Sequence, residues 1–195
     1  MASEAADRWN LRYQEDSKNS FEMPRPLLQD HADLLPVRGL ALDLAMGLGG
    51  SASFLLQRGL RVIGVDISFV AVKKAQSKLP RLMAVVANLE HFYIPASTFD
   101  VIIDFLYLQR DLWQPIYHGL KTGGLIYIEC LTEAMLSIHP EINPAYLLKS
   151  GELHQTFSSG IMGQNLEILY YREGWQPSST SHRRATASLI ARRNA

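Results

Sequence analysis

Two aspartates flank a glycine-rich run in the first third of the chain. Asp43 lies just before Gly47 and Gly49. Asp66 follows Gly47 by roughly 20 residues, which is the spacing of the ribose-binding acid in dinucleotide sites. Glycines at such a turn let the backbone bend tightly and let a ligand approach main-chain N–H groups at a helix start. The run fits a loose dinucleotide fingerprint ending at Ala52, but α/β proteins without any ligand share that pattern, so it leaves the ligand open.

The position of Asp43 distinguishes between the ligands that such a loop can hold. A carboxylate just before the glycines would repel a bound pyrophosphate, and the loop contains no Lys or Arg to offset the repulsion. This argues against a nicotinamide cofactor and favours a ligand with a positive charge, such as an amino-acid ammonium. Asp66 can accept from both hydroxyls of a ribose, and a strand-end helix cap is its alternative role. S-adenosylmethionine, a nucleoside with a cationic tail, suits both carboxylates.

Short apolar runs alternate with amphipathic stretches through most of the chain. Near-continuous hydrophobicity predicts strands that are covered on both faces in a parallel sheet. Helices are expected over 51–58, ending at Gly59, and from the N-cap Ser68 to Leu79. This alternation predicts an α/β fold, a three-layer sandwich with right-handed crossovers. Its strands are expected over 40–44, 61–65, 82–86, 99–103 and 124–128.

In the last third of the chain the alternation of strands and helices ends. Runs 166–171 and 186–191 predict two successive strands, which would form an antiparallel hairpin appended to the sheet. Segment 132–163 is long for a plain connection, and such segments often carry lids or binding loops. Residues 1–35 are expected to form a helical cap that prolines interrupt. Since no domain boundary is visible, we expect a single domain over 1–195 with these two elaborations.

The chain resembles the class I S-adenosylmethionine-dependent methyltransferases over essentially all of its length. Its glycine run resembles the first motif of the family, Asp66 the ribose-binding acid, and 121–124 the turn before the fifth strand. Residues 9–13 and 24–26 resemble the lead-in of small methyltransferases related to tellurite-resistance enzymes. The resemblance implies a Rossmann-like methyltransferase fold, whose mostly parallel sheet has the order 3-2-1-4-5-7-6 with one antiparallel strand. It also implies S-adenosyl-L-methionine as the cofactor.

The resemblance implies several contacts with this cofactor. Gly47 and Gly49 would line the methionine portion, and Asp43 would contact its ammonium. Asp66 would hold the ribose hydroxyls, and Ile67 would pack against the adenine. The complete set is Arg12, Tyr13, Asp43, Gly47, Gly49, Asp66, Ile67, Asn88 and Leu89.

Four members of this set come from outside the glycine region. Asn88 and Leu89 follow the third strand, where the family often has an acid or amide that accepts from the adenine amino group. An ordinary turn residue is the alternative role for Asn88. Arg12 and Tyr13 would close over the carboxylate of the cofactor from the N-terminal segment, with plain surface positions as the alternative.

The fourth strand leads into the region where the family brings the methyl group to its acceptor. Asp104 and Tyr107 would orient the acceptor as catalytic residues, and Arg110 would hold an anionic one; an ion-paired or solvated Arg110 is the alternative. Together with insertion 132–163, Tyr107 and Arg110 are expected to set acceptor choice. The Asn/Asp-Pro-Pro-aromatic signature of many nucleic-acid amino methyltransferases is absent, which argues against methylation of base nitrogens.

Composition narrows the possible partners. The 19 Lys and Arg balance the 19 Asp and Glu, which argues against a nucleic-acid partner. A single cysteine, Cys130, excludes a disulfide framework, and the histidine spacing predicts no metal site. The arginine pairs 183–184 and 192–193 are interpreted as solvated charges at the ends of a strand, with a phosphate contact as the alternative. The start of the sequence has no signal region and no apolar run approaches the roughly 20 residues of a membrane span, so we expect a cytoplasmic protein without a membrane partner.

These observations predict methyl transfer from S-adenosylmethionine to a small-molecule acceptor. No side chain stands out as a matched general base, which favours an acceptor that is already nucleophilic, such as a soft thiol or chalcogen. Two other classes stay open at this point. One is a cofactor-binding regulatory module without turnover, and the other is an RNA or protein methyltransferase.

Overall fold

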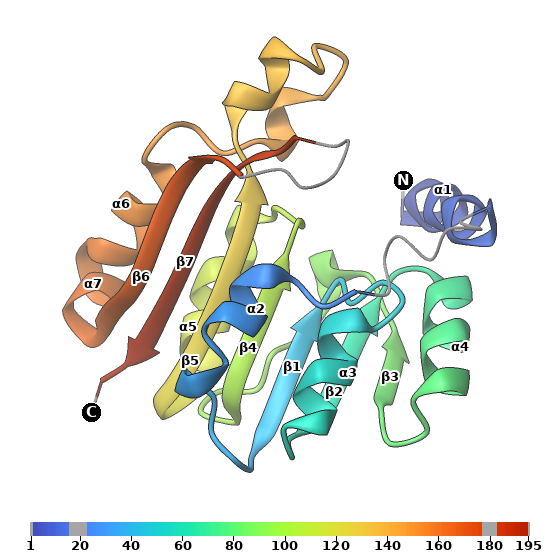
Figure 1. Cartoon of the computed structure of the whole chain (residues 1–195), viewed down its shortest axis with the longest axis horizontal. Coiled ribbons are helices and arrows are strands. Elements are labelled where there is room, and N and C mark those ends of the chain that lie inside the picture. The colour runs from blue at the N-terminus through green and yellow to red at the C-terminus, as the bar shows by residue number, and fades with distance from the viewer. Residues whose placement is uncertain (1, 16–22, 177–182, 195) are drawn as a thin grey trace.

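The apolar runs expected as strands all form strands of one sheet (Figure 1). The computed structural model describes residues 2–15, 23–176 and 183–194. Its sheet has seven strands in the order β3-β2-β1-β4-β5-β7-β6, which confirms the expected order. The strands are β1 (Leu40–Leu44), β2 (Arg61–Asp66), β3 (Met83–Val86), β4 (Phe99–Phe105), β5 (Leu120–Leu131), β6 (Leu166–Trp175) and β7 (Ala185–Arg193).

Strand β7 runs antiparallel to both of its neighbours, β5 and β6, while the other pairs of neighbours are parallel. The predicted Rossmann-like methyltransferase fold is therefore confirmed.

One expectation needs a correction. Segment 121–124, expected as a turn before the fifth strand, lies inside β5, where the pairing register with β4 shifts after Phe99 and Gly123 adopts a left-handed φ of 78°. An extra stretch of chain is thus accommodated as a bulge.

The helices follow the expected boundaries closely where local capping signals are strong. Ser68 accepts a hydrogen bond from Ala71 N at 3.1 Å and caps α4, as expected, and Gly59 takes a left-handed φ of 98° after α3. Pro26 opens α2, where its missing N–H costs no helical hydrogen bond. The helices are α1 (Ala2–Glu15), α2 (Pro26–Asp30), α3 (Gly50–Gln57), α4 (Phe69–Lys78), α5 (Trp113–Gly119), α6 (Glu152–Ser158) and α7 (Gly160–Asn165).

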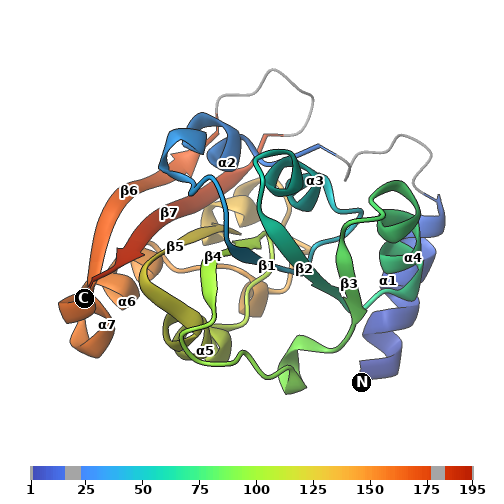
Figure 2. The same ribbon diagram turned by 90° about the horizontal axis from the view of Figure 1, so that it is seen from below.

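The two faces of the sheet have separate cores. One core joins α2, α3 and α4 to alternate strand residues such as Ala41, Val101 and Tyr127. The other joins α5 and α6 to the alternate set, which includes Leu42 and Ile128. Figure 2 shows these two helical layers with the sheet between them. The period-2 alternation of side chains along buried strands produces this three-layer arrangement.

The carboxyl ends of the parallel strands share one edge of the sheet, at the top of Figure 1. Insertion 132–163 leaves β5 at this edge and contains two short 3₁₀ helices, Glu133–Ser137 and Pro144–Tyr146, before α6 and α7. From the expected helical cap, α1 packs beside α4 (Figure 2), whereas residues 16–22 lie outside the described part of the chain. The segment that links β6 to β7, 177–182, also lies outside it. Among the described residues, no helix has the length and apolar composition needed to cross a membrane.

Candidate cofactor and acceptor site

The loop between β1 and α3 turns through three left-handed residues. Ala45 has a φ of 51°, Gly47 of 54° and Gly49 of 78°. Gly49 N donates to Met46 O at 3.0 Å, which closes the turn before α3 begins. A Cβ on Gly47 would lie 2.8 Å from the hydroxyl of Tyr13. Glycine is therefore required at Gly47 both for its backbone conformation and for the close approach of a neighbouring side chain.

Asp66 ties this loop to the end of β2. Its Oδ2 accepts from Gly47 N at 2.8 Å, and its Oδ1 accepts from Ser68 N at 2.8 Å. The side chain is buried, and this burial raises the pKa of Asp66 although the two backbone hydrogen bonds oppose the shift. Asp66 thus caps two backbone N–H groups, which is the alternative role expected for it. Since a carboxylate has about four lone-pair sites, some acceptor capacity also stays available for ligand hydroxyls.

Asp43 is a buried carboxylate with an oxygen that lacks a partner. Its side chain is 3 % exposed, and within the described part of the chain its Oδ2 has no hydrogen-bond donor. Burial, and then the neighbouring charge of Asp66, raise the pKa of Asp43 well above its usual range. A hydrogen bond from the Ala52 backbone opposes this shift. A cationic hydrogen-bond donor beside Asp43 would remove the desolvation penalty, so the position suits an ammonium.

Asp104 ends the neighbouring strand but faces the other side of the sheet. It pairs with Leu44 in the register of β1 and β4, and Leu44 belongs to the core beneath α5. The side chain is fully buried, and neither of its oxygens has a hydrogen-bond partner among the described residues. Burial and the charge of Asp43 raise the pKa of Asp104. Because the carboxyl is enclosed, its expected role in orienting an acceptor stays a prediction.

Helix α1 is fixed to the start of α4 by polar contacts. Asn10 Oδ1 accepts from Ser68 Oγ at 2.7 Å and from Val70 N at 3.2 Å. Lys74 Nζ donates to Tyr13 O at 2.5 Å. Ser68 therefore caps α4 and holds α1, which places the N-terminal helix next to the glycine loop.

Tyr13 is the residue of α1 that reaches the glycine loop. It is buried, its hydroxyl lies over Gly47, and its ring stacks on Trp9 with centroids 5.6 Å apart. The guanidinium of Arg12 lies over the same Trp9 ring at 5.4 Å from its centroid, on the exposed side of the helix. Of the two residues expected to close over the cofactor, Tyr13 therefore lies at the glycine loop and Arg12 lies on the exposed side of α1.

The residues assigned to the adenine are engaged in contacts of their own. Asn88 Oδ1 accepts from Glu90 N at 3.1 Å, and Asn88 Nδ2 donates to Glu90 Oε2 at 3.0 Å. These contacts are the ones expected of Asn88 in its alternative role as an ordinary turn residue. Leu89 is buried in the core, and Ile67 is half-buried after β2. Their contact with an adenine stays a prediction.

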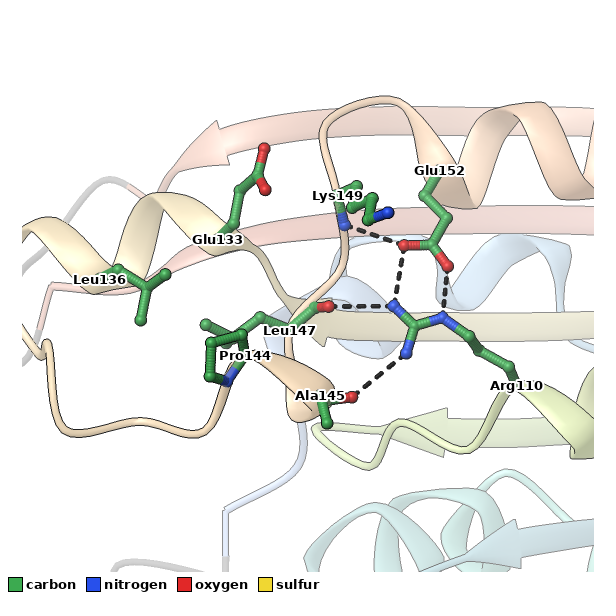
Figure 3. Close-up of a pocket in the computed structure, with 8 residues that line it drawn as sticks. All are labelled: Arg110, Glu133, Leu136, Pro144, Ala145, Leu147, Lys149 and Glu152. Carbon is green, nitrogen blue, oxygen red and sulfur yellow. Dashed lines mark hydrogen bonds and ion pairs between the residues drawn. The ribbon is translucent and has the colours of Figure 1, made fainter.

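Arg110 holds the insertion in place. Figure 3 shows its guanidinium between Glu152 and two main-chain carbonyls. Arg110 Nε and Nη2 donate to the two Glu152 oxygens at 2.5 and 2.9 Å, and Nη1 and Nη2 donate to Ala145 O and Leu147 O at 3.2 and 3.0 Å. This hydrogen bonding lowers the pKa of Glu152, which also accepts from Lys149 N at 2.9 Å. The ion-paired alternative for Arg110 is the one that the structure shows.

The same contacts form one wall of an open cavity of about 620 Å³ (Figure 3). The insertion supplies most of its lining, which consists of Arg110, Glu133, Leu136, Pro144, Ala145, Leu147, Lys149 and Glu152. Tyr107, expected beside Arg110, is absent from this lining. Its hydroxyl donates to Gln109 Oε1 at 2.7 Å, and burial, with a smaller contribution from Asp104, raises the pKa of Tyr107 to about 12.

An arginine that was assigned no role lies at the same edge of the sheet. Arg25 donates through Nε to Glu129 Oε1 at 3.0 Å, and its Nη2 reaches the same oxygen. Glu129 is 2 % exposed on β5, and its Oε2 accepts from Ser188 Oγ at 3.1 Å. The backbone N of Arg25 donates to Ser51 Oγ at 3.3 Å, directly after the glycine loop. A lone glutamate within the apolar run of β5 is the sequence signal for this pair.

Arg184 corrects a sequence interpretation. It was expected to be a solvated charge, but it is half-buried just before β7. Burial, and then the positive charges of Arg25 and Arg12, lower the pKa of Arg184, while Glu129 opposes the shift. The sequence showed an arginine pair but not the side chains that the fold places around it.

The site is rich in carboxylates but has no arrangement of metal ligands. Within the described residues, no group of three or more His, Cys, Asp or Glu side chains is placed to hold a metal ion. Its buried polar atoms instead suit an organic cation. The unpartnered Oδ2 of Asp43 and the spare acceptor capacity of Asp66 fit the ammonium and ribose of the expected cofactor.

Comparison with protein families agrees with this arrangement. A family profile described as a methyltransferase domain matches residues 41–124, which span β1 to the start of β5. The match therefore covers the glycine loop and the three aspartates discussed above.

Two curated relatives carry the same kind of domain. The chain is 26 % identical over 129 residues to the malonyl-[acyl-carrier protein] O-methyltransferase of Hamiltonella defensa, covering 64 % of this chain and 49 % of that protein. It is 31 % identical over 97 residues to the trans-aconitate 2-methyltransferase of Rhodopseudomonas palustris, covering 45 % and 36 % of the two chains. The chain thus spans half or less of the length of these relatives.

Solved structures show the same fold over nearly the whole chain. TehB from Haemophilus influenzae aligns with a TM-score of 0.70 at 14 % sequence identity, covering 97 % of this chain and 67 % of that one. The alignment includes the strands beyond residue 124, which lie outside the family profile.

Proposed function

We propose that the chain is a class I S-adenosylmethionine-dependent methyltransferase and that it transfers the methyl group of S-adenosylmethionine to a small-molecule acceptor; the methyltransferase-domain profile and the fold support this. The observation that supports this most directly is the unpartnered Oδ2 of buried Asp43, close to Asp66 and to a left-handed glycine turn. When bound, the cofactor supplies an electrophilic methyl group on a positively charged sulfur.

The residues of this chain would bind and orient the cofactor. Asp43 would accept from its ammonium, and Asp66 would accept from the ribose hydroxyls while its backbone hydrogen bonds hold its orientation. Gly47 and Gly49 would allow close approach to the main chain, and Tyr13 would cover the loop and exclude water. Alignment of the reacting groups in such a site can contribute up to about 7–11 kcal/mol.

An acceptor that needs no general base fits the acceptor side. Deprotonation of Tyr107 is disfavoured by a pKa of about 12, and burial raises the pKa of the Cys130 thiol. A soft thiol or chalcogen anion meets this requirement, and so does a carboxylate. The names of the two relatives mention malonyl and trans-aconitate, which are both carboxylate compounds. We also propose that nucleic acid is not the acceptor, in keeping with the balanced charge, and that the protein acts in the cytoplasm.

Calorimetry with S-adenosylmethionine, S-adenosylhomocysteine and NAD tests the proposal. The first two should bind and NAD should not. Formation of S-adenosylhomocysteine would then be measured with four classes of acceptor, namely thiols, carboxylates, RNA and protein. Cofactor binding without turnover in every class would indicate a regulatory module, and turnover on RNA or protein alone would replace the small-molecule acceptor. NAD binding in the absence of S-adenosylmethionine binding would overturn the whole proposal.

A further inference from the structure

Three arginines from distant parts of the chain lie around one glutamate at the carboxyl edge of the sheet. Arg12 lies in α1, Arg25 precedes α2, and Arg184 precedes β7. Glu129, near the end of β5, is the carboxylate among them, and it favours the charged form of Arg184 while Arg25 and Arg12 disfavour it. We refer to Arg12, Arg25 and Arg184 as the arginine cluster.

Both carboxylate oxygens of Glu129 already have hydrogen-bond partners. It is buried, with Oε1 bound to Arg25 and Oε2 bound to Ser188 Oγ. Glu129 therefore compensates Arg25 through direct hydrogen bonds and offsets the charge of Arg184 only in part. Two partners on the buried carboxylate also fix the position of the Arg25 guanidinium.

The charge of Arg184 is only partly compensated within the described part of the chain, where Glu129 acts on it against Arg25 and Arg12. Among the described residues, its guanidinium has no hydrogen-bonded acceptor, although the residue is half-buried. Burial and the nearby Arg25 and Arg12 lower the pKa of Arg184, so its charged form is held in an unfavourable place. Burying a charge without a partner costs free energy, which a bound anion would offset.

The cluster is connected to the start of α3, after the glycine loop, and to the segment that follows β4. The backbone N of Arg25 contacts Ser51 Oγ at the start of α3, and Leu106 N donates to Glu129 O at 2.6 Å. Leu106 follows β4 in a left-handed conformation with a φ of 61°. In open α/β sheets, ligands bind outside the carboxyl ends of the strands, and both the cofactor loop and the cluster lie there.

We propose that Arg184, supported by Arg25, binds a carboxylate group of the methyl acceptor, so that the acceptor is a small carboxylic acid. This inference rests on the proposed function and identifies its substrate class. A guanidinium matches the two oxygens of a carboxylate through paired N–H donors, which a thiolate does not. The acceptor anion would then lie beside the positively charged cofactor that the aspartates are proposed to hold.

The test measures binding to protein saturated with S-adenosylhomocysteine. Calorimetry would use butyrate, glutarate and tricarballylate, each beside its uncharged methyl ester. At least one carboxylate should bind the wild type, and its ester should bind at least tenfold more weakly. Arg184→Gln should weaken carboxylate binding at least tenfold and leave S-adenosylhomocysteine affinity within about twofold, since separated sites act independently. Arg192→Gln is the matched control, because Arg192 lies on β7 in an exposed ion pair with Glu167; it should bind like the wild type.

Thermal unfolding separates a binding role from a structural one. Without ligand, Arg184→Gln should melt at the same temperature as the wild type or higher, because an only partly compensated cation is removed. The carboxylate that binds should raise the melting temperature of the wild type and not that of the variant. Wild type that binds S-adenosylhomocysteine but none of the three carboxylates would overturn this inference and leave the proposed function intact. Equal carboxylate affinity in wild type and Arg184→Gln would overturn it as well.

Discussion

The two halves of the carboxyl edge differ in charge and in how the chain builds them. The half over β1, β2 and β4 carries buried aspartates, namely Asp43, Asp66 and Asp104. The half over β5 and β7 carries Arg25 and Arg184. The first half comes mainly from one stretch of chain around the glycine loop. The second half depends on Glu129, which contacts residues far away in the sequence. Arg25 lies 104 positions before it and Ser188 lies 59 positions after it.

This difference separates two kinds of binding. Buried carboxylates with unpartnered oxygens favour a cation, whereas half-buried guanidinium groups favour an anion. A methyltransferase with this edge would place a positively charged cofactor opposite a negatively charged acceptor. The following four predictions test whether the two halves act as separate sites, in order of decreasing expected effect.

Asp43→Asn should have the largest effect. Removing a buried charge that accepts from the cofactor ammonium should weaken S-adenosylmethionine binding by about 2–3 kcal/mol, roughly 30- to 150-fold. Calorimetry would measure the change. Asp100→Asn is the matched control, since Asp100 pairs with Lys121 at 2.8 Å at the opposite end of β4. A wild-type dissociation constant in folded Asp43→Asn would show that the buried carboxylate is not part of the cofactor half.

Asp66→Ala should weaken S-adenosylmethionine binding by roughly 1.5–3 kcal/mol, because a charged acceptor of ribose hydrogen bonds is lost. It should also lower the free energy of unfolding by about 1–2 kcal/mol, since Gly47 N and Ser68 N lose their acceptor. Calorimetry and urea unfolding would measure the two effects separately. Loss of stability with unchanged cofactor affinity would assign Asp66 to capping alone.

Asp104→Asn should flatten the pH dependence of stability. Burial raises the pKa of Asp104 in the folded protein above the roughly 3.9 of an unfolded aspartate, so the folded state binds more protons than the unfolded state between these two pKa values. Wild-type stability should therefore fall as the pH rises through this window. The variant should lose up to about 1.4 kcal/mol per pH unit of that slope.

Urea unfolding at pH 5, 6, 7 and 8 would measure this slope. Asp100→Asn is again the control, because hydrogen bonding with Lys121 lowers the pKa of Asp100 against the effect of burial, and its contribution is lost only as the pH falls through that lowered pKa. A slope for Asp104→Asn equal to the wild-type slope would mean that this carboxyl is not a buried proton site in solution.

Arg110→Ala and Glu152→Gln should have the smallest effects on the fold and should resemble each other. The pair is partly exposed, so each change should cost at most about 1 kcal/mol of stability. Both should reduce acceptor turnover by loosening the insertion, and both should leave cofactor affinity within about 0.5 kcal/mol. If the measured turnover falls in Arg110→Ala but not in Glu152→Gln, this would instead indicate that Arg110 contacts the acceptor directly.

The sequence predicted the order of elements well because the relevant signals are local. Apolar runs indicated all seven strands, and Ser68 and Gly59 marked helix ends as expected. Segment 121–124 shows where local patterns stop being sufficient, because a glycine turn and a bulge within a strand share the same residues. The loop with Gly47 and Gly49 also formed where expected, because only glycine adopts its left-handed turns readily.

The acceptor half depended on contacts that sequence spacing does not encode. Arg110 takes its ion-paired alternative role, since Glu152 binds it. Arg184, expected to be solvated, is half-buried without a hydrogen-bonded acceptor in the described part of the chain. The sequence does not distinguish a solvated arginine from a paired or a buried one, because only the surroundings in the fold decide which of these states it takes. Carboxylates close to their loop in sequence, by contrast, could be assigned a chemistry from residue type and spacing alone.

The sequence by itself thus determined the sheet, the glycine loop and the carboxylates Asp43 and Asp66 beside that loop, since turn conformation and strand periodicity are properties of short segments. The tertiary structure alone decided that Tyr13 covers Gly47, that Glu129 pairs with Arg25, and that Glu129 compensates Arg184 only in part. Charge compensation depends on distance and burial, and only the folding of distant segments onto one edge of the sheet fixes both.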